Sequence, residues 1–455
     1  MSDGGVFARI QPREAGGKWI SLNGDYSGLE LLSAHYDPKA ERYVAGAQDN
    51  CAIVTKANAT PSDVGYGFVM GDGTVTMVDS QANPSRLFGT TQFLGVGTIE
   101  NDPKSNEDAA GNSVVDGGDD DDEGCGGLCF AQGDKFIQVE VDKYFPEPSS
   151  FPFFVHPYTL NRQDPTLLHF WTNGTGPNRP SAFYEFNIPY SVEDKDDIGA
   201  PTKMLETPPG AMIMDFVSGG VTAGKADPNL LLGISNSHLY VRSIVDQGPN
   251  GAMLERQLPV AFDAPVTLQY DYSKNGARIL GPLTHAKTVF MAVSPSDSRF
   301  LAVTGWPSVS TNLGKEHIFV TTNAGETWQN VTSNLRTATG VSGKVRPGGL
   351  LLVDLPPKGG GMARALLVGT SNGIMVAFLY LSGAVVSEAN AKWTRFGTCD
   401  EFPIVLTAGI DYEPISDRLV AATYGRGIYI LKDAKEKLLS IIERLELEWR
   451  EEVQI

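Results

Sequence analysis

Acidic side chains at strand ends are the groups in this chain best suited to catalysis. Asp49 directly follows a predicted strand that runs through Gly46. Cleavage of a glycosidic bond needs two carboxyl groups beside that bond, about 5 to 10 Å apart. The acidic residues considered as the partner of Asp49 are Asp72, Asp79, Asp215 and Asp411. Glycoside hydrolysis or polysaccharide cleavage with Asp72 or Asp411 is one hypothesis, and hydrogen bonding of Asp49 to turn amides is the favoured alternative.

Aromatic and acidic residues elsewhere offer two further kinds of site. Trp171 and Trp306 can stack on sugar rings, although packing in the core is the favoured interpretation. In the acidic run 116–123, Asp116, Asp119 and Asp121 are candidate Ca²⁺ ligands, because hard cations bind several carboxylate oxygens. The run lacks EF-hand spacing, so a solvated loop is favoured over calcium and no other cofactor is predicted. The chain also lacks a serine nucleophile elbow and a Walker-type loop.

The cysteines are compatible with disulfides but not with a zinc site. Cys125 and Cys129 lie in Cys-Gly-Gly-Leu-Cys, the spacing of a small disulfide loop, whereas Cys51 and Cys399 are far apart in the sequence. None of the histidines has ligand spacing to the first pair, so metal binding there is not expected.

Composition limits the classes of partner. The 455 residues include 36 basic and 54 acidic side chains, a formal net charge of −18. Nucleic acids and anionic membranes attract clustered cations, so neither is an expected partner. No apolar run is long enough for a membrane-spanning helix. The N-terminus lacks signal-peptide features, so either the chain is intracellular or its signal lies outside this sequence. If the chain is secreted, the sequons at Asn58, Asn173 and Asn330 permit glycosylation.

A repeating pattern of three or four short apolar runs separated by Pro, Asp or Gly turns predicts the architecture. Its seven copies begin at Leu29, Thr74, Pro152, Met212, Val289, Leu350 and Thr407. In the second copy the last run is residues 95–100, and in the fourth the first turn is Asp227-Pro228. The fifth copy has its first run at 289–293 and ends in a hairpin of runs 317–321 and 328–331. Each copy spans about 60 residues, as four-stranded propeller blades with their loops do. The seventh copy lacks an outer strand, and residues 18–22 are predicted to supply it and close the ring. A pair of β-sandwiches is the alternative.

Two segments depart from this pattern. Residues 101–127 are acidic and glycine-rich, which predicts an insertion loop. Residues 432–455 contain no Gly or Pro and have apolar residues at helical spacing, including Leu438, Ile441 and Leu445. This tail is predicted to be an amphipathic helix that packs on the sheets or joins two copies of the chain.

Three motifs resemble those of the sialidase-like and sortilin-like BNR (Asp-box) propeller superfamily, and distantly the xyloglucanase-type propellers. The turn from Thr321 to Trp328 resembles an Asp-box hairpin, with Asn323 where the family usually has Asp. Residues 43–50 resemble the end of a blade's second strand, and residues 423–430 resemble the strand pair of a last blade. The resemblance covers most of residues 18–431. It departs at Cys51, which either pairs with Cys399 across the ring or is a buried thiol.

The sequence therefore predicts an all-β, seven-bladed propeller over residues 1–431 with a C-terminal helix over 432–455. We expect a secreted or lumenal binding scaffold for a glycan or a protein partner, with a cytoplasmic location left open. A glycoside hydrolase or polysaccharide lyase using Asp49 is the alternative. The candidate ligand-binding residues, at strand ends or in aromatic positions, are Gln48, Asn50, Trp171, Trp306, Tyr424 and Arg426.

Overall fold

The computed structural model describes most of the chain. The described residues are 7–11, 19–21, 29–48, 50–56, 58, 65–69, 73–90, 128–132, 135–139, 141–145, 156–172, 180–193, 195–209, 211–259, 262, 270–271, 278–279, 289–305, 317–339, 348–358, 361–381, 391–398 and 401–453. These residues form antiparallel sheets and few helices, which confirms the predicted all-β class.

The first four large sheets follow one another along the chain, and each has four strands in sequence order. The first sheet contains β3 (Leu31–Asp37), β4 (Arg42–Ala47), β5 (Ala52–Thr55) and β6 (Gly65–Val69). The second contains β7 (Thr76–Asp79), β8 (Arg86–Thr90), β9 (Leu128–Gln132) and β10 (Lys135–Val139). The third contains β11 (Tyr158–Leu160), β12 (Leu167–Thr172), β13 (Pro180–Asn187) and β14 (Thr202–Pro209). The fourth contains β15 (Asp215–Thr222), β16 (Lys225–Ile234), β17 (His238–Arg242) and β18 (Leu254–Gln257).

Three more large sheets and two small ones complete the described strands. The fifth sheet contains β21 (Val289–Val293), β22 (Leu301–Gly305), β23 (His317–Thr321) and β24 (Gln329–Asn330). The sixth contains β25 (Gly349–Lys358), β26 (Gly361–Thr370), β27 (Gly373–Leu381) and β28 (Thr394–Arg395). The seventh has three strands, β29 (Thr407–Glu413), β30 (Arg418–Thr423) and β31 (Gly427–Lys432). The small sheets pair β1 (Phe7–Arg9) with β2 (Trp19–Ser21) and β19 (Tyr270–Asp271) with β20 (Arg278–Ile279).

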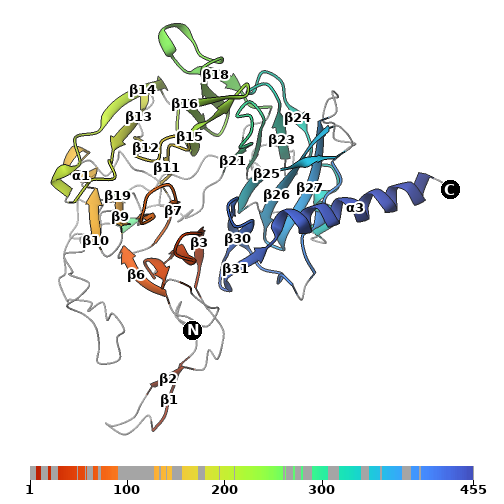
Figure 1. Ribbon diagram of the computed structural model, residues 1–455, viewed down its shortest axis with the longest axis horizontal. Helices are drawn as coiled ribbons and strands as arrows, with labels where there is room; N and C mark the ends of the chain where they lie inside the picture. Colours follow the sequence, from red (N-terminus) through yellow and green to blue (C-terminus); the bar gives the residue numbers. More distant parts are fainter. Residues whose placement is uncertain are drawn as a thin grey trace.

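The large sheets pack face to face in cyclic order. The first strand of each sheet contacts the first strand of the next, and β29 of the seventh contacts β3 of the first. An apolar cluster of described residues fills each of the seven interfaces between neighbouring sheets. Figure 1 shows the sheets following one another around a common centre. Because both faces of each sheet are covered, strands such as β21 and β22 are buried at every position rather than at every second one.

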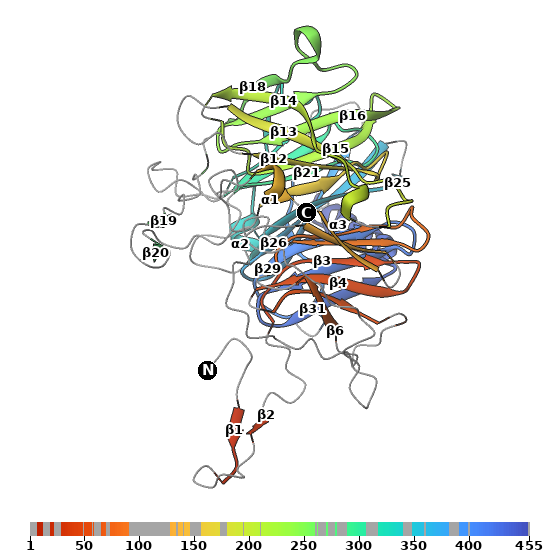
Figure 2. The ribbon, with the colours of Figure 1, turned by 90° about the vertical axis from the view of Figure 1, so that its left-hand side faces the viewer.

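The N-terminal strand does not complete the seventh sheet, contrary to the prediction for residues 18–22. β2 pairs with β1 in a separate ribbon, with Trp19 opposite Arg9. This ribbon projects from the body of the molecule (Figure 2). The first and seventh sheets meet instead through side-chain packing, in which Leu31 and Ala34 contact Val420 and Ala422.

Two strand assignments also differ from the sequence prediction. The predicted third strand of the second unit, residues 95–100, lies outside the described residues, and β9 follows the acidic insertion 101–127 and pairs with β8. In the fourth sheet the β15–β16 turn lies at Ala223 and Gly224, not at Asp227-Pro228. A register shift between Ser218 and Gly220 accommodates Pro228 inside β16, because the ladder is interrupted there.

The Asp-box hairpin has the predicted geometry. β23 pairs with β24, and the Thr321 hydroxyl accepts the amides of Asn323 (3.2 Å) and Gly325 (3.0 Å). The Asn323 side-chain oxygen accepts the Thr327 amide at 3.0 Å. Gly325 has φ of +87°, a conformation that favours glycine. The hairpin therefore closes itself with its own side chains.

Helices are short except at the C-terminus. α1 spans Val141–Tyr144 and α2 spans Leu335–Thr339, whereas α3 spans Ala434–Val453 and confirms the predicted C-terminal helix. Leu438, Ile441 and Ile442 of α3 are buried against the sixth and seventh sheets. The apolar face thus packs within the chain, and assembly of two copies through α3 stays a prediction. None of the described helices has the length and apolarity to cross a membrane.

Candidate functional site

The contact between the first and seventh sheets, here called the seam, brings predicted ligand-binding residues together. The Tyr424 hydroxyl donates to Gln48 Oε1 at 2.7 Å, although the two residues are 376 positions apart. The Gln48 amide donates to the carbonyl of Glu30 at 2.9 Å, and Glu30 also bridges to Tyr424. The Asn50 side chain donates to the Gln48 carbonyl at 2.9 Å. One end of the seam is therefore a polar surface built by Gln48, Asn50 and Tyr424.

A second polar contact lies further along the same seam. His35 Nδ1 and Asp411 Oδ2 are 2.8 Å apart, and their side chains are 24% and 32% exposed. Burial tends to raise the pKa of Asp411, but the charge and hydrogen bond of His35, the Tyr412 amide and the Arg162 charge together lower it below its usual value. Asp411 is therefore a carboxylate at neutral pH, within reach of solvent.

The charge of Arg162, which belongs to the third sheet, acts on this carboxylate. It follows β11, and the carboxylates of both Asp411 and Asp215 act on its charge. Its side chain is accessible to solvent, yet burial among surrounding protein atoms lowers its pKa. We call His35, Arg162, Asp215 and Asp411 the central cluster.

Local chain geometry positions the two members of the cluster on the third and fourth sheets. Asn161 Oδ1 accepts the amides of Gln163 (2.9 Å) and Asp164 (3.2 Å), which fixes the turn that carries Arg162. A Cβ at Gly219 would lie 2.0 Å from that same oxygen, so the close approach of β15 requires glycine. Asp215 Oδ2 accepts the Met291 amide at 2.9 Å and so connects β15 to β21.

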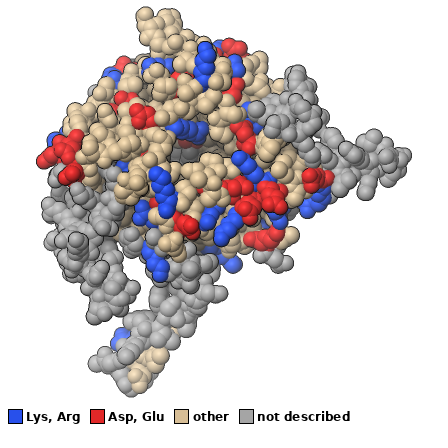
Figure 3. All heavy atoms as spheres, in the orientation of Figure 1, with Lys and Arg blue, Asp and Glu red and all other residues tan. Residues whose placement is uncertain are grey.

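The surface near the middle of the ring is hollowed. Figure 3 shows this face as spheres, with basic (blue) side chains at the edge of the hollow and acidic ones (red) nearby. The central cluster supplies two carboxylates, one guanidinium and one imidazole, which together donate and accept hydrogen bonds in several directions. Such a set can bind a polar ligand. Among the described residues there is no group of three His, Cys, Asp or Glu side chains that would hold a metal ion.

The other predicted site residues are placed as follows. Arg426 is exposed in the turn between β30 and β31, next to Tyr424. Trp171 is fully buried between the third and fourth sheets, as the favoured prediction of packing in the core has it. It therefore does not stack on a ligand. Cys51 is a half-buried thiol rather than half of a disulfide, and Cys129 lies in β9. Predictions that fall outside the described residues concern Asp49, Asp72, Trp306, Asp116, Asp119, Asp121, Cys125 and Cys399.

One buried polar network looks catalytic but cannot serve that role. His169 hydrogen-bonds Ser218 Oγ at 2.6 Å through Nδ1 and Glu185 at 2.9 Å through Nε2, so it has the three residue types of a serine triad with the two ring nitrogens exchanged. Ser218 has no exposed surface, so no substrate can reach its hydroxyl. This network instead joins β15 of the fourth sheet to β12 and β13 of the third.

Two members of the central cluster, His35 and Arg162, were not predicted from the sequence. A signal for His35 does exist, because Ser33, His35 and Asp37 are polar at every second position of an otherwise apolar strand. Nothing local marks Arg162, because its position depends on the turn at Asn161 and on packing of the fourth sheet. Comparison of the sequence with known protein families gave no match, and no curated protein is significantly similar to it.

Proposed function

We propose that the seven large sheets are the blades of a seven-bladed β-propeller and that the protein is a binding scaffold for a glycan or a protein partner. The cyclic contacts of the first strands and the seven apolar clusters between neighbouring sheets support the propeller. In this architecture the first strands surround a central channel. The central cluster lies on or beside those strands, at the place where propellers commonly bind ligands.

The observation that carries the binding function is that His35, Arg162 and Asp411, all polar or charged, are accessible to solvent on or beside the first strands of their sheets. Sugar hydroxyls and exposed peptide groups are recognised by such fixed donors and acceptors. Gln48, Asn50 and Tyr424 extend the polar surface to one end of the seam. A secreted or lumenal location is part of the proposal. Asn58 is exposed in a turn and begins a glycosylation sequon, so a glycan attached to Asn58 would support that location.

A glycan array and co-purification test the binding function. The wild-type chain should bind a defined set of glycans or retain one protein partner, and Asp411→Asn and Arg162→Met should each weaken binding by about tenfold, because each removes a charge-assisted hydrogen bond. Asp196→Asn is the matched control, because Asp196 is exposed in the 3₁₀ turn Lys195–Asp197, outside the cluster. Absence of any glycan or protein ligand, or equal binding by all three variants, would contradict the proposal.

A glycoside hydrolase is the second candidate, favoured by one specific observation. The charges of Asp411 and Asp215 both act on Arg162, and glycoside hydrolysis needs two carboxyl groups beside one bond. With its pKa lowered, Asp411 would serve as the base or nucleophile rather than the acid. Screening plant and algal polysaccharides with the wild type, Asp411→Asn, Asp215→Asn and Asp49→Asn tests this role. No release of sugar by the wild type, or full activity in all three variants, would exclude it.

A further inference from the structure

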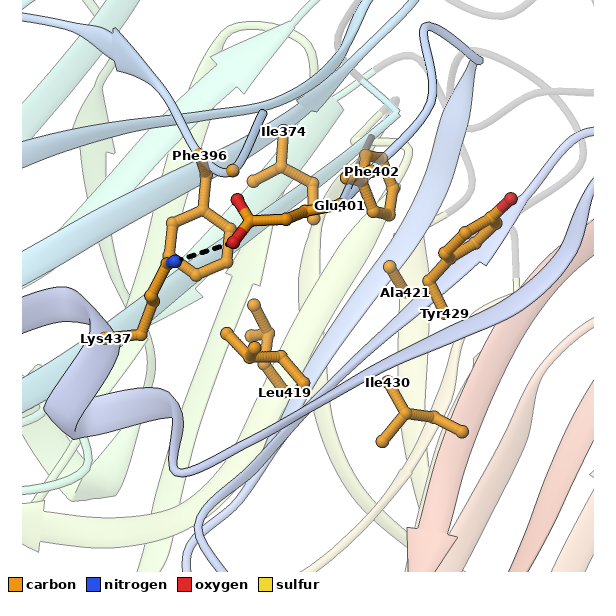
Figure 4. A pocket seen from close by; sticks show the side chains of 11 residues that line it. Ile374, Phe396, Glu401, Phe402, Leu419, Ala421, Tyr429, Ile430 and Lys437 are labelled. Atoms are coloured by element: carbon orange, nitrogen blue, oxygen red, sulfur yellow. Dashed lines mark hydrogen bonds and ion pairs between the residues drawn. The ribbon is translucent and has the colours of Figure 1, made fainter. Parts of the chain in front are cut away.

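A separate cavity lies between the sixth sheet, the seventh sheet and α3, and we call it the α3 pocket. Its volume is about 100 Å³. Figure 4 shows side chains converging on it from β27, β30, β31, α3 and the segment after β28. Three aromatic rings, Phe396, Phe402 and Tyr429, form part of its wall, and Glu401 and Lys437 lie at its edge. The pocket is separate from the central cluster, with which it shares no residue.

The aromatic walls are held in place by packing. Phe396 and Phe402 are buried in the cluster that joins the sixth and seventh sheets to α3. The rings of Phe402 and Tyr429 meet edge to face, with centroids 4.9 Å apart. Aliphatic side chains, including Ile374 and Leu419, complete the wall. The cavity therefore offers aromatic rings and methyl groups in a fixed arrangement.

The edge of the pocket carries a carboxylate. Glu401 Oε1 lies 2.8 Å from Lys437 Nζ, and Glu401 Oε2 accepts the Thr398 amide at 2.8 Å. The hydrogen bond from Lys437 and those from Thr398 lower the pKa of Glu401, so it is ionised at neutral pH. The side chains of Lys437 and Glu401 are 38% and 48% exposed, and ion pairs in contact with solvent are weak and readily exchanged.

We infer that the α3 pocket binds a small quaternary ammonium compound. Aromatic rings attract cations through their faces, and N-methyl groups pack well against rings and aliphatic side chains. Glu401 adds a negative charge beside the pocket, and the net charge of −18 favours cationic over anionic ligands. Lys437 competes for Glu401, so we expect it to move aside when the ligand binds. This inference does not depend on the proposed function of the central cluster.

Choline and its uncharged carbon isostere, 3,3-dimethyl-1-butanol, test the inference directly. The two have nearly the same shape and differ in charge. Calorimetric titration of the full chain should show choline binding about three- to thirty-fold more tightly, the range expected for cation–π attraction. Equal affinity, or a preference for the alcohol, would overturn the inference, because the pocket would then be merely apolar. Tighter binding to phosphatidylcholine vesicles than to choline would also overturn it, in favour of a membrane headgroup.

Variants at the pocket separate binding from folding. Lys437→Gln should raise the affinity for choline several-fold, because it removes the competing ammonium group, whereas Glu401→Gln should lower it. Lys432→Gln, an exposed change on β31 outside the pocket, is the matched control. Tyr429→Phe should retain the preference for choline over the alcohol and Tyr429→Leu should reduce it, with thermal unfolding confirming that both fold. Indistinguishable affinities for Lys437→Gln, Glu401→Gln and Lys432→Gln would refute the site.

Discussion

Replacement of Arg86 by methionine should be among the most destabilising single changes in the described part of the chain. The Arg86 and Asp79 side chains form an ion pair with no exposed surface, with Nε 3.0 Å from Asp79 Oδ2. The guanidinium also donates to the carbonyls of Ile188 (2.6 Å) and Pro165 (2.8 Å), which connects the second sheet to the third. Methionine fills much of the same space but removes the charge and these donors.

The size of the effect follows from what remains buried. Arg86→Met leaves the Asp79 carboxylate without its cation, and breaking a buried pair on one side costs about 3–5 kcal/mol. Asp79→Asn in the same chain removes the orphaned charge. The amide oxygen that this change introduces could still accept the backbone hydrogen bonds that Asp79 Oδ1 receives from Gln81 (2.9 Å) and Ala82 (3.4 Å). The double variant should therefore be more stable than Arg86→Met by about 1 kcal/mol or more.

Urea unfolding measured by fluorescence gives the stability of each variant. Because a chain of this size need not unfold in one step, hydrogen exchange of β8 and β12 should accompany it and show the loss locally. Asp196→Asn serves as the surface control and should be close to the wild type. A loss below about 1 kcal/mol for Arg86→Met, or a double variant no more stable than the single one, would refute the reasoning.

Three further changes test other parts of the structure. Asn323→Ala removes the oxygen that accepts from Thr321 Oγ1 and the Thr327 amide, and should cost about 1–2 kcal/mol of stability in urea unfolding. Asn323→Asp keeps an oxygen that accepts both hydrogen bonds and should be nearly neutral. Leu438→Ala in α3, at a fully buried position, should cost about 2–5 kcal/mol and speed proteolysis of the C-terminus, with exposed Ser440→Ala as the control. Because folding lowers the pKa of Asp411, its carboxylate stabilises the folded state above its unfolded pKa of about 3.9 and that contribution disappears as pH falls through the folded pKa. The free energy of unfolding of the wild type should therefore exceed that of Asp411→Asn by about 1 kcal/mol at pH 7, and the difference should vanish in acid. A difference that stays constant across a pH series of unfolding midpoints would contradict this.

Strands with a local signal were predictable from the sequence. The prediction of residues 289–293 coincides with β21, and the hairpin from His317 to Val331 was placed within about one residue. Both segments are apolar runs bounded by turn-forming residues, so the local chain specifies them. The helix predicted over 432–455 was found as α3 for the same reason, because its apolar residues recur at helical spacing.

Features that depend on distant pairing were not predictable. β9 pairs with β8 across the insertion 101–127, and nothing in residues 128–132 identifies which strand they join. Pro228 suggested a turn, but the register shift opposite Gly219 removes the need for a ladder hydrogen bond at that point. The strand at residues 18–22 was correctly identified as extended and wrongly assigned to the seventh sheet, because two edge strands can compete for one partner.

The candidate site shows the same division. Gln48, Asn50 and Tyr424 were predicted individually as strand-end residues, and their meeting at the seam follows from contact of the first and seventh sheets. Asp411 was among the acids considered, but its partner His35 lies 376 residues away and no local pattern links them. Two of the four residues of the central cluster, Asp215 and Asp411, were among the acids considered from the sequence. How the four residues lie relative to one another depends on the packing of the sheets, which no local pattern specifies.

Stability alone does not account for the central cluster. The attraction within an ion pair that is partly removed from water is little larger than the cost of desolvating its two charges. Replacing such a pair by apolar side chains often leaves the protein as stable as before, or more stable. The neighbouring seam positions Leu31, Val420 and Ala422 are apolar, so this interface can pack without charges. Buried pairs such as Arg86–Asp79 satisfy carbonyls that have no access to water, whereas His35, Asp411 and Arg162 remain accessible to solvent. Solvent-accessible charged groups that packing of the seam does not require are the feature that the proposed binding function would explain.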